Sequence, residues 1–204
     1  MDATAGRGQK IWRQEINDVS KAESLSRMDW TVAATVALGA TGVDGVRVEA
    51  LARQLKTSKG SFYWHFRDRA DLLDALLTLW EDEGTEQVIA AAAHLPTPAA
   101  RLDAVLEEAV QFDVHGAEVS AVEGAIRAWA GQDEATAARV RLIDARRVDY
   151  LRDELQLAGH APDVAQRRAE GLYLALLGYY AAHRYASPTA TGDALAVLLR
   201  LAVD

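Results

Sequence analysis

The stretch from Leu51 to Leu73 reads LARQLKTSKGSFYWHFRDRADLL and predicts two short helices joined by a tight turn. Over the first helix an apolar residue recurs every three or four positions, at Val48, Leu51, Ala52 and Leu55. One face of that helix is therefore expected to pack inward. The turn falls at Lys56 and Thr57, and the Ser58 hydroxyl can cap the second helix by accepting from backbone N–H groups. This order predicts a helix-turn-helix, whose second helix enters the major groove of DNA.

The second helix begins with KGSFY, and its first turn carries groups suited to DNA. Gly60 has no side chain to hold a phosphate or a base edge away from the backbone. Lys59, Ser61 and Tyr63 offer an ammonium group and two hydroxyls. Because Lys59 and Tyr63 are four residues apart, they share one face of the helix.

These residues resemble the tetracycline-repressor (TetR) family of bacterial transcriptional regulators. The resemblance is close from Trp30 to Leu77, and its most specific string is SKGSFYWHF, residues 58–66, followed by DLL at the start of a long helix. It implies an all-α regulator that binds DNA as a homodimer. The residues expected at the DNA are Arg47, Thr57, Ser58, Lys59, Gly60, Ser61, Tyr63, Trp64, His65 and Arg69.

The sequence departs from the family pattern at two positions. Lys56 stands where the family usually has a turn glycine, which costs free energy if the turn needs a positive φ. Arg47 stands where Ser or Thr often caps the first helix, so that cap must come from elsewhere or be missing.

Composition and charge narrow the functional classes. The chain has 204 residues, half of them hydrophobic, and no cysteine, which excludes disulfides and thiolate metal sites. The longest charge-free apolar segment, residues 171–182, is shorter than the roughly 20 residues of a membrane span. No secretory signal is recognisable, so we expect a cytoplasmic protein without a membrane partner.

The net charge of −8 is unevenly distributed. Residues 1–75 carry 11 basic and 10 acidic side chains, whereas residues 76–204 carry 11 and 20. Between Arg47 and Arg69 six basic residues face two acidic ones. The positive potential that attracts phosphate is therefore local to the helix-turn-helix, and the acidic remainder would keep the rest of the protein away from DNA.

Three segments are expected along the chain. Residues 1–27 form an N-terminal arm, either a tail or packing extension or a basic arm that lies in a minor groove. Residues 28–75 form a three-helix DNA-binding domain whose first helix is capped by Asp29 and ends at Gly42. Residues 76–204 form a larger helical domain for effector binding and dimerisation. No stretch alternates strictly enough to predict a sheet, so the fold class is all-α.

Helix signals divide the second domain. One helix is expected to run from Asp68 toward Ala93, and Thr97 caps the next at Pro98. Further helices are expected at about 117–130, 134–157 and 162–184, and the last begins at Asp193.

Large aromatic and isolated polar residues in this domain are candidates for an effector pocket. Helical bundles bind small molecules between such side chains, although a place in the core is the better default for any single aromatic. The candidates are Trp80, Phe112, His115, Trp129, Asp144, Tyr150 and Tyr173. Asp144 interrupts an apolar stripe. If it is buried it needs an arginine, a hydroxyl or a ligand as its partner, and the alternative is a surface ion pair with Arg141 or Arg147. The i,i+4 pair of Glu123 and Arg127 is predicted to lie on the surface.

The last two helices are predicted to form a dimer interface. Both are apolar on more than one face, and a terminal helix of this kind needs cover that its own chain cannot supply. A four-helix bundle from two subunits would cover both. The expected contacts are Leu172, Leu176, Tyr179, Tyr180, His183, Leu195, Leu198 and Leu199.

The sequence contains little that predicts a catalytic or metal site. The five histidines lack HExxH spacing, and the sequence has neither a phosphate loop nor a GxSxG elbow. We therefore expect no enzyme, no metal and no cofactor. The predicted function is a DNA-binding regulator, most simply a repressor released from a palindromic operator by a small-molecule effector. The alternative is a helical ligand-binding or scaffold protein without regulatory DNA binding.

Overall fold

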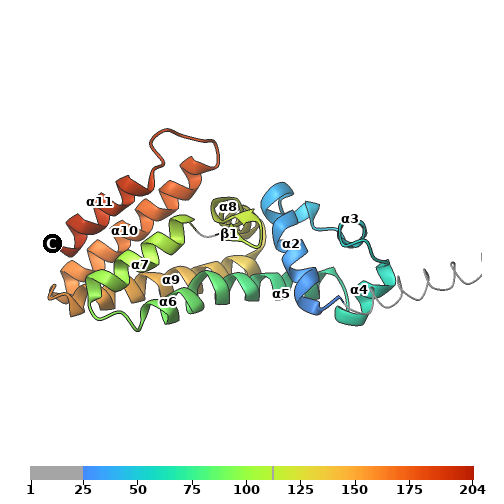
Figure 1. The fold of residues 1–204 in the computed structure, drawn as a ribbon, viewed down its shortest axis with the longest axis horizontal. Helices are drawn as coiled ribbons and strands as arrows, with labels where there is room; N and C mark the ends of the chain where they lie inside the picture. The colour runs from blue at the N-terminus through green and yellow to red at the C-terminus, as the bar shows by residue number, and fades with distance from the viewer. Residues whose placement is uncertain (1–24, 112) are drawn as a thin grey trace, which may run out of the picture.

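The computed structural model describes residues 25–111 and 113–204 (Figure 1). The described residues are mainly helical, which confirms the all-α class. The predicted arm at residues 1–27 lies outside the described residues except for its last three. The DNA-binding half contains α2 (Arg27–Thr41), the 3-10 turn η1 (Val43–Gly45), α3 (Val48–Gln54) and α4 (Lys59–His65).

Helix α2 begins earlier than the sequence predicted. Its N-cap is Ser26, whose hydroxyl accepts from the Asp29 N–H at 3.2 Å, while the Asp29 carboxylate accepts from the Ser26 N–H at 2.7 Å. Asp29 is therefore the third helical residue of a reciprocal capping box rather than the cap itself. The predicted end is confirmed, because Gly42 follows the helix with a φ of 73°.

A long interrupted helix connects the two halves. It consists of α5 (Arg69–Glu81), one π-helical turn η2 (Asp82–Glu86) and α6 (Gln87–Ala92). Asp68 caps α5, since its carboxylate accepts from the Asp71 N–H at 2.9 Å. The sequence predicted one continuous helix and gave no sign of the π turn, a feature that is often found at functional sites.

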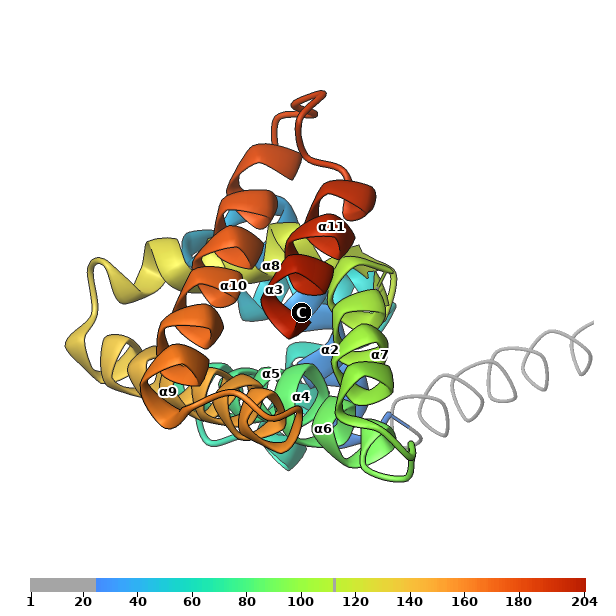
Figure 2. The same cartoon turned by 90° about the vertical axis from the view of Figure 1, so that its left-hand side faces the viewer.

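The larger half continues with α7 (Pro98–Gln111), α8 (Val119–Ala130), α9 (Glu134–Leu157), α10 (Pro162–His183) and α11 (Gly192–Val203). Figure 2 shows α10 and α11 side by side, with α7 beside α11 and α9 against α10. Between α7 and α8 lies a hairpin of two antiparallel strands, β1 (Asp113–Val114) and β2 (Ala117–Glu118). The prediction of no strand is corrected here, because two-residue strands are too short to show an alternating pattern.

The main hydrophobic core joins the two halves. Trp30, Leu38 and Phe62 of the DNA-binding half belong to the same buried cluster as Val122 and Ile126 of α8. A second, smaller cluster at the far end includes Leu102, Leu155 and Leu199. The DNA-binding half is thus packed directly on α8 as well as being continuous with α5, as Figure 1 shows. None of the helices in the described part of the chain has the length and apolarity to cross a membrane.

Candidate DNA-binding surface and ligand cavity

The turn of the helix-turn-helix is held by local backbone geometry. Lys56 adopts a φ of 54°, so this position does require the left-handed conformation that glycine adopts more readily. The Thr57 N–H donates to the Ala52 carbonyl at 2.9 Å, and the Ser58 hydroxyl accepts from the Ser61 N–H at 3.2 Å. Arg47 precedes α3 without a side-chain capping bond. The turn therefore places a non-glycine residue at a positive φ, and α3 begins without a side-chain cap.

One face of α4 is packed into the core. Phe62 and Phe66 are buried, and the Phe62 ring meets Trp30 edge to face with centroids 5.3 Å apart. Ser61 is only 5% exposed. It therefore lies with Phe62 on the inner side of the helix, and its expected contact with DNA stays a prediction.

The opposite face of α4 exposes chemistry suited to DNA. Tyr63 is 59% exposed and Trp64 is 87% exposed, which is unusual for side chains of this size. Lys59 is also exposed, and its ammonium lies 2.5 Å from the Glu49 carboxylate. Hydrogen bonding to that partner raises the pKa of Lys59 and lowers the pKa of Glu49. A DNA phosphate would therefore compete with Glu49 for Lys59.

The remaining predicted contacts surround this face. Arg47, Ser58 and Gly60 are exposed, and His65 is half-buried. A Cβ built on Gly60 would meet nothing closer than the Ser58 hydroxyl at 3.4 Å, so the fold itself does not require glycine there. This observation fits a glycine retained for close approach of a partner. The Thr57 hydroxyl is buried without a hydrogen-bond partner among the described residues.

Arg69 has a role that the sequence did not reveal. Its guanidinium donates to the Val46 carbonyl at 2.6 Å and also to the Val43 carbonyl. The side chain thereby ties the start of α5 to the segment before α3. Its proposed approach to the DNA backbone stays a prediction.

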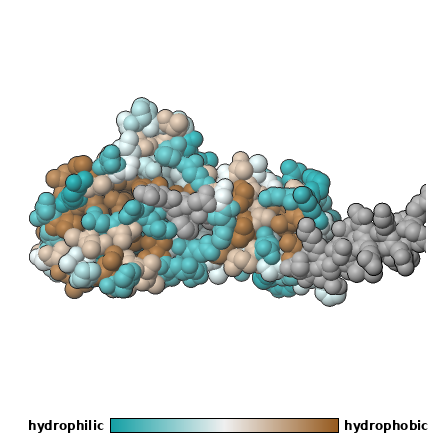
Figure 3. Space-filling view, in the orientation of Figure 1, coloured by the Kyte–Doolittle hydropathy of each residue, from teal (hydrophilic) through white to brown (hydrophobic). Residues whose placement is uncertain are grey.

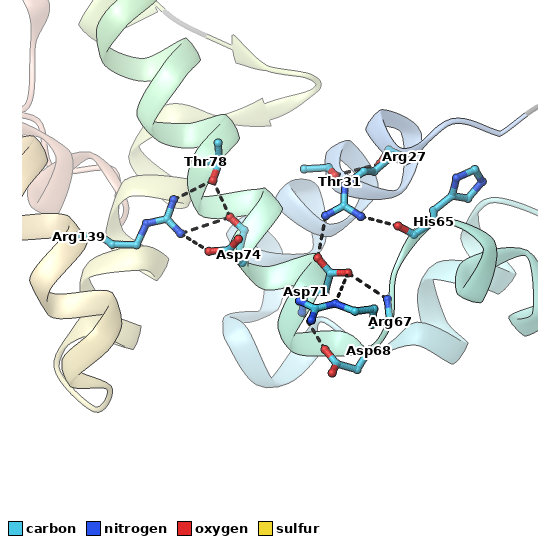
Figure 4. A network of polar contacts seen from close by, with 9 residues as sticks. All are labelled: Arg27, Thr31, His65, Arg67, Asp68, Asp71, Asp74, Thr78 and Arg139. Atoms are coloured by element: carbon cyan, nitrogen blue, oxygen red, sulfur yellow. Dashed lines mark hydrogen bonds and ion pairs between the residues drawn. The ribbon is translucent and has the colours of Figure 1, made fainter.

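Arg27 anchors the C-terminal end of α4 and was not singled out from the sequence. Figure 4 shows it reaching from α2 to the His65 carbonyl and to the Asp71 carboxylate on α5, the latter at 2.8 Å. The guanidinium carbon also lies 4.0 Å from the centre of the Phe66 ring. Hydrogen bonds from Arg27 and from the Arg67 N–H lower the pKa of Asp71 to about 2. These contacts fix the orientation of α4 relative to α2 and α5.

The larger half encloses a cavity of about 110 Å³. Its walls come from α5, η2, α6, α7, α8, α9, α10 and α11, with Thr35 contributed by α2. Three of the predicted pocket residues, Trp80, Tyr150 and Tyr173, line it. A cavity between helices of a bundle, lined mainly by apolar side chains, is a typical ligand site.

The other predicted pocket residues lie elsewhere. Trp129 packs against the main core. His115 occupies the hairpin turn with a φ of 55°, and its imidazole lies 2.9 Å from the Glu83 carboxylate. Asp144 does not line the cavity directly, and Phe112 lies outside the described residues.

Glu123 is the centre of a buried polar network. The residue is 2% exposed, and its Oε1 accepts from the Trp80 indole N–H at 2.9 Å and from Arg147 at 2.8 Å. Arg127 lies 3.3 Å from Oε2. Burial acts to raise the pKa of Glu123, but Arg147 and Arg127 together keep it below the ordinary value. The prediction of a surface pair between Glu123 and Arg127 is therefore wrong, because α8 turns this face toward α9.

Asp144 is paired with an arginine and a hydroxyl, the kinds of partner expected for a buried acid, and not with either of the predicted surface arginines. Arg127 donates to its two carboxylate oxygens at 3.1 and 2.9 Å, and the Tyr173 hydroxyl donates at 2.6 Å. The predicted surface partners are engaged elsewhere, Arg141 with Glu134 and Arg147 with Glu123. Burial raises the pKa of Tyr173 to about 12 against the lowering effect of the two arginines, so its hydroxyl stays protonated.

Hydrogen bonds and packing contacts connect the walls of the cavity to the DNA-binding half. Arg147 donates to the Thr85 hydroxyl at 2.9 Å and to the Gly84 carbonyl at 3.1 Å, which holds the π turn η2 at the cavity wall. On α2, a Cβ at Gly39 would lie 3.2 Å from a Val122 methyl on α8. On α5, Asp74 and Thr78 accept from Arg139 of α9, as Figure 4 shows.

The predicted dimer residues divide between the inside and the outside of the subunit. Leu172, Leu176, Tyr180, Leu195 and Leu199 line the cavity. Their place in a dimer interface stays a prediction, because a helix that is apolar all round does not reveal from the sequence which side faces inward. His183 pairs with Glu118 at 2.8 Å, Tyr179 is half-buried, and Leu198 is exposed. The most exposed apolar residues of these helices are instead Leu174 and Leu201, at 67% and 66%.

The helix-turn-helix exposes an aromatic and basic face, and it is attached to a helical domain that has a cavity. This combination is typical of DNA-binding regulators. Residues 31–76 match the family model described as bacterial regulatory proteins, tetR family. The resemblance to the tetracycline-repressor family is thereby confirmed.

Solved structures share the fold along nearly the whole chain. A TetR-family transcriptional regulator from Streptomyces coelicolor superposes with a TM-score of 0.73 at 18% identity, covering 90% of this chain and 95% of that one. A transcriptional regulator from Rhodococcus gives 0.71 at 18%, covering 88% and 96%. A TetR-family regulator from Agrobacterium tumefaciens gives 0.66 at 18%, covering 91% and 97%. No curated protein sequence matches the chain. The chain has the fold of a TetR-family transcriptional regulator.

Proposed function

We propose that the protein is a homodimeric transcriptional repressor that binds a palindromic operator and is released by a small molecule. The observation that carries this proposal is the outer face of α4, where Lys59, Tyr63 and Trp64 are exposed while the inner face is fixed in the core. Such a face is preorganised for the major groove. Two copies would reach half-sites about one helical turn, roughly 34 Å, or somewhat more apart.

Dimerisation is supported by the outer surface of α10 and α11. Leu174, Val197 and Leu201 are exposed there, and a Cβ at Gly171 or Gly178 would meet no atom within 4 Å. Figure 3 shows hydrophobic surface at this end of the molecule. Small residues beside exposed leucines allow two helices to approach closely, and a second copy would bury this apolar area.

Release by an effector is supported by the walls of the cavity. Thr35 lines it from α2, and η2 lines it from the helix that begins as α5 in the DNA-binding half. A molecule that fits the cavity in only one arrangement of these helices would shift the population toward that arrangement. If the favoured arrangement holds the two α4 helices at the wrong separation, operator affinity falls.

The same proposal places the protein in the cytoplasm, where its DNA is, and gives it no catalytic role. Support for a regulator rather than an enzyme comes from the family match of the helix-turn-helix domain. Within residues 25–111 and 113–204 no group of three or more His, Asp or Glu side chains is arranged to hold a metal ion.

Sequencing the fragments of source genomic DNA that the purified full chain retains tests this function. We expect enrichment of a palindromic motif, with the protein bound as a dimer. Retention without any enriched motif, or no retention in low salt, would favour the helical ligand-binding or scaffold alternative.

A further inference from the structure

The walls of the cavity are predominantly apolar. Aliphatic side chains such as Leu79, Ile89, Val105 and Leu176 supply most of the surface, together with the ring of Trp80. A ligand that replaces water here must therefore present mainly carbon surface.

The charged groups beside the cavity compensate one another. Glu123 is paired with Arg147 at 2.8 Å, and Asp144 is paired with Arg127 at 2.9 Å. Arg147 also donates to the Thr85 hydroxyl and to the Gly84 carbonyl. With two anions and two cations matched, the interior has no spare charge to neutralise an ionised ligand, and an unpaired ion would keep its full desolvation cost.

Three tyrosines line the cavity, and only one has an unused hydroxyl. Tyr173 donates to Asp144 at 2.6 Å, and Tyr180 donates to the Ala109 carbonyl at 2.9 Å. The Tyr150 hydroxyl oxygen is buried and has no hydrogen-bond partner among the described residues. A buried polar group without a partner is costly, so a ligand atom that completes it would be favoured.

The edge of the cavity is acidic. Glu83 and Glu108 line both the cavity and a neighbouring hollow. Glu83 is partly balanced by His115 at 2.9 Å, whereas Glu108 is exposed. Negative charge at the edge disfavours the entry of anions.

We propose that the cavity binds a neutral, mostly hydrocarbon molecule with one hydrogen-bonding oxygen, such as an alcohol, ketone or ester, and that the Tyr150 hydroxyl is its polar contact. This inference rests on the proposed function, because it names the chemical class of the effector.

Calorimetric titration of the full chain with three eight-carbon probes tests the class: 1-octanol, octanoate and octylammonium at pH 7. We expect 1-octanol to bind and each ion to bind at least tenfold more weakly. Tyr150→Phe should weaken 1-octanol binding roughly three- to tenfold, as expected for one neutral hydrogen bond. In the absence of probe it should keep or raise the melting temperature, because it removes a buried hydroxyl that has no protein partner among the described residues.

Tyr180→Phe is the matched control, because this residue also lines the cavity but its hydroxyl is engaged by Ala109. It should lower the melting temperature and leave 1-octanol binding nearly unchanged. Equal or tighter binding of either ion, no binding of 1-octanol to the wild type, or wild-type affinity in Tyr150→Phe would overturn the proposal. Binding of 1-octanol without any change in operator affinity would support the ligand class and contradict release by an effector.

Discussion

Replacing Arg147 by an uncharged residue tests how much the stability of the fold depends on the pairing of Arg147 with the buried Glu123 carboxylate. Arg147→Met keeps an unbranched side chain but leaves the Glu123 carboxylate, 2% exposed, with Arg127 at 3.3 Å as its one remaining charged partner among the described residues. Breaking a buried pair in this way costs about 3–5 kcal/mol. For a chain of this length each kcal/mol lowers the melting temperature by roughly 2–4 °C, so we expect a decrease of roughly 6–20 °C.

The double variant separates charge from packing. In Arg147→Met with Glu123→Gln, the amide oxygen can still accept from Trp80, and the uncompensated charge is gone. The double variant should therefore be more stable than Arg147→Met alone by at least about 2 kcal/mol. Because an unpaired buried carboxylate has a raised pKa, Arg147→Met alone should also lose part of its defect as the pH falls toward that pKa.

Urea unfolding monitored by circular dichroism measures all three proteins. Two results would contradict the claim that Arg147 neutralises the buried Glu123 carboxylate. One is a decrease of less than about 1 kcal/mol in the free energy of unfolding of Arg147→Met, and the other is a double variant that is no more stable than the single one.

Three further outcomes follow from other contacts. Because the pKa of Asp71 is lowered from 3.8 to about 2, its ionised form stabilises the fold above pH 4, and this stabilisation is lost as the pH falls toward 2. In Asp71→Asn the free energy of unfolding should depend less on pH in this range, and an unchanged pH dependence would contradict the ion pair. Leu174→Glu should dissociate the dimer, as measured by light scattering, whereas Leu142→Glu, at a similarly exposed leucine of α9, should not. Equal effects of the two variants would contradict the assignment of α10 to the dimer interface. Glu49→Gln should tighten operator binding in an anisotropy titration, because it removes the carboxylate that pairs with Lys59, and weaker binding would show that Glu49 positions the lysine instead.

Features fixed by local sequence were predictable. Ser58 capping α4 and Pro162 opening α10 depend on residues within one turn of chain. The bounds of α9 at Glu134 and Leu157 are those expected from the pattern. The start of the first helix of the DNA-binding half differs from the prediction, because Ser26 and Asp29 are both acceptors of one capping box and the sequence pattern alone does not show which of them is the N-cap.

Features that depend on long-range packing were not predictable. The choice of Arg127 as the partner of Asp144 depends on how α8 crosses α9. The burial of Glu123 depends on Trp80, which is far away in sequence. The inward face of α10 could not be chosen because Leu172 and Leu174 are equally apolar, although only Leu174 is highly exposed. A single sequence holds no signal for any of these three.

DNA recognition by α4 can be measured by fluorescence anisotropy on the enriched palindrome, comparing the wild type with Lys59→Ala and Tyr63→Phe from about 50 to 200 mM salt. Both variants should fold as the wild type does, because the two side chains lie on the exposed face. We expect Lys59→Ala to weaken operator binding. If Lys59 contacts a phosphate, the slope of log K against log salt concentration should decrease by about one unit. If it contacts a guanine, the loss of binding free energy should be roughly 1–3 kcal/mol and confined to one base pair. Tyr63→Phe should weaken binding without changing the fold. Wild-type affinity and salt slope in both variants would contradict DNA recognition by α4.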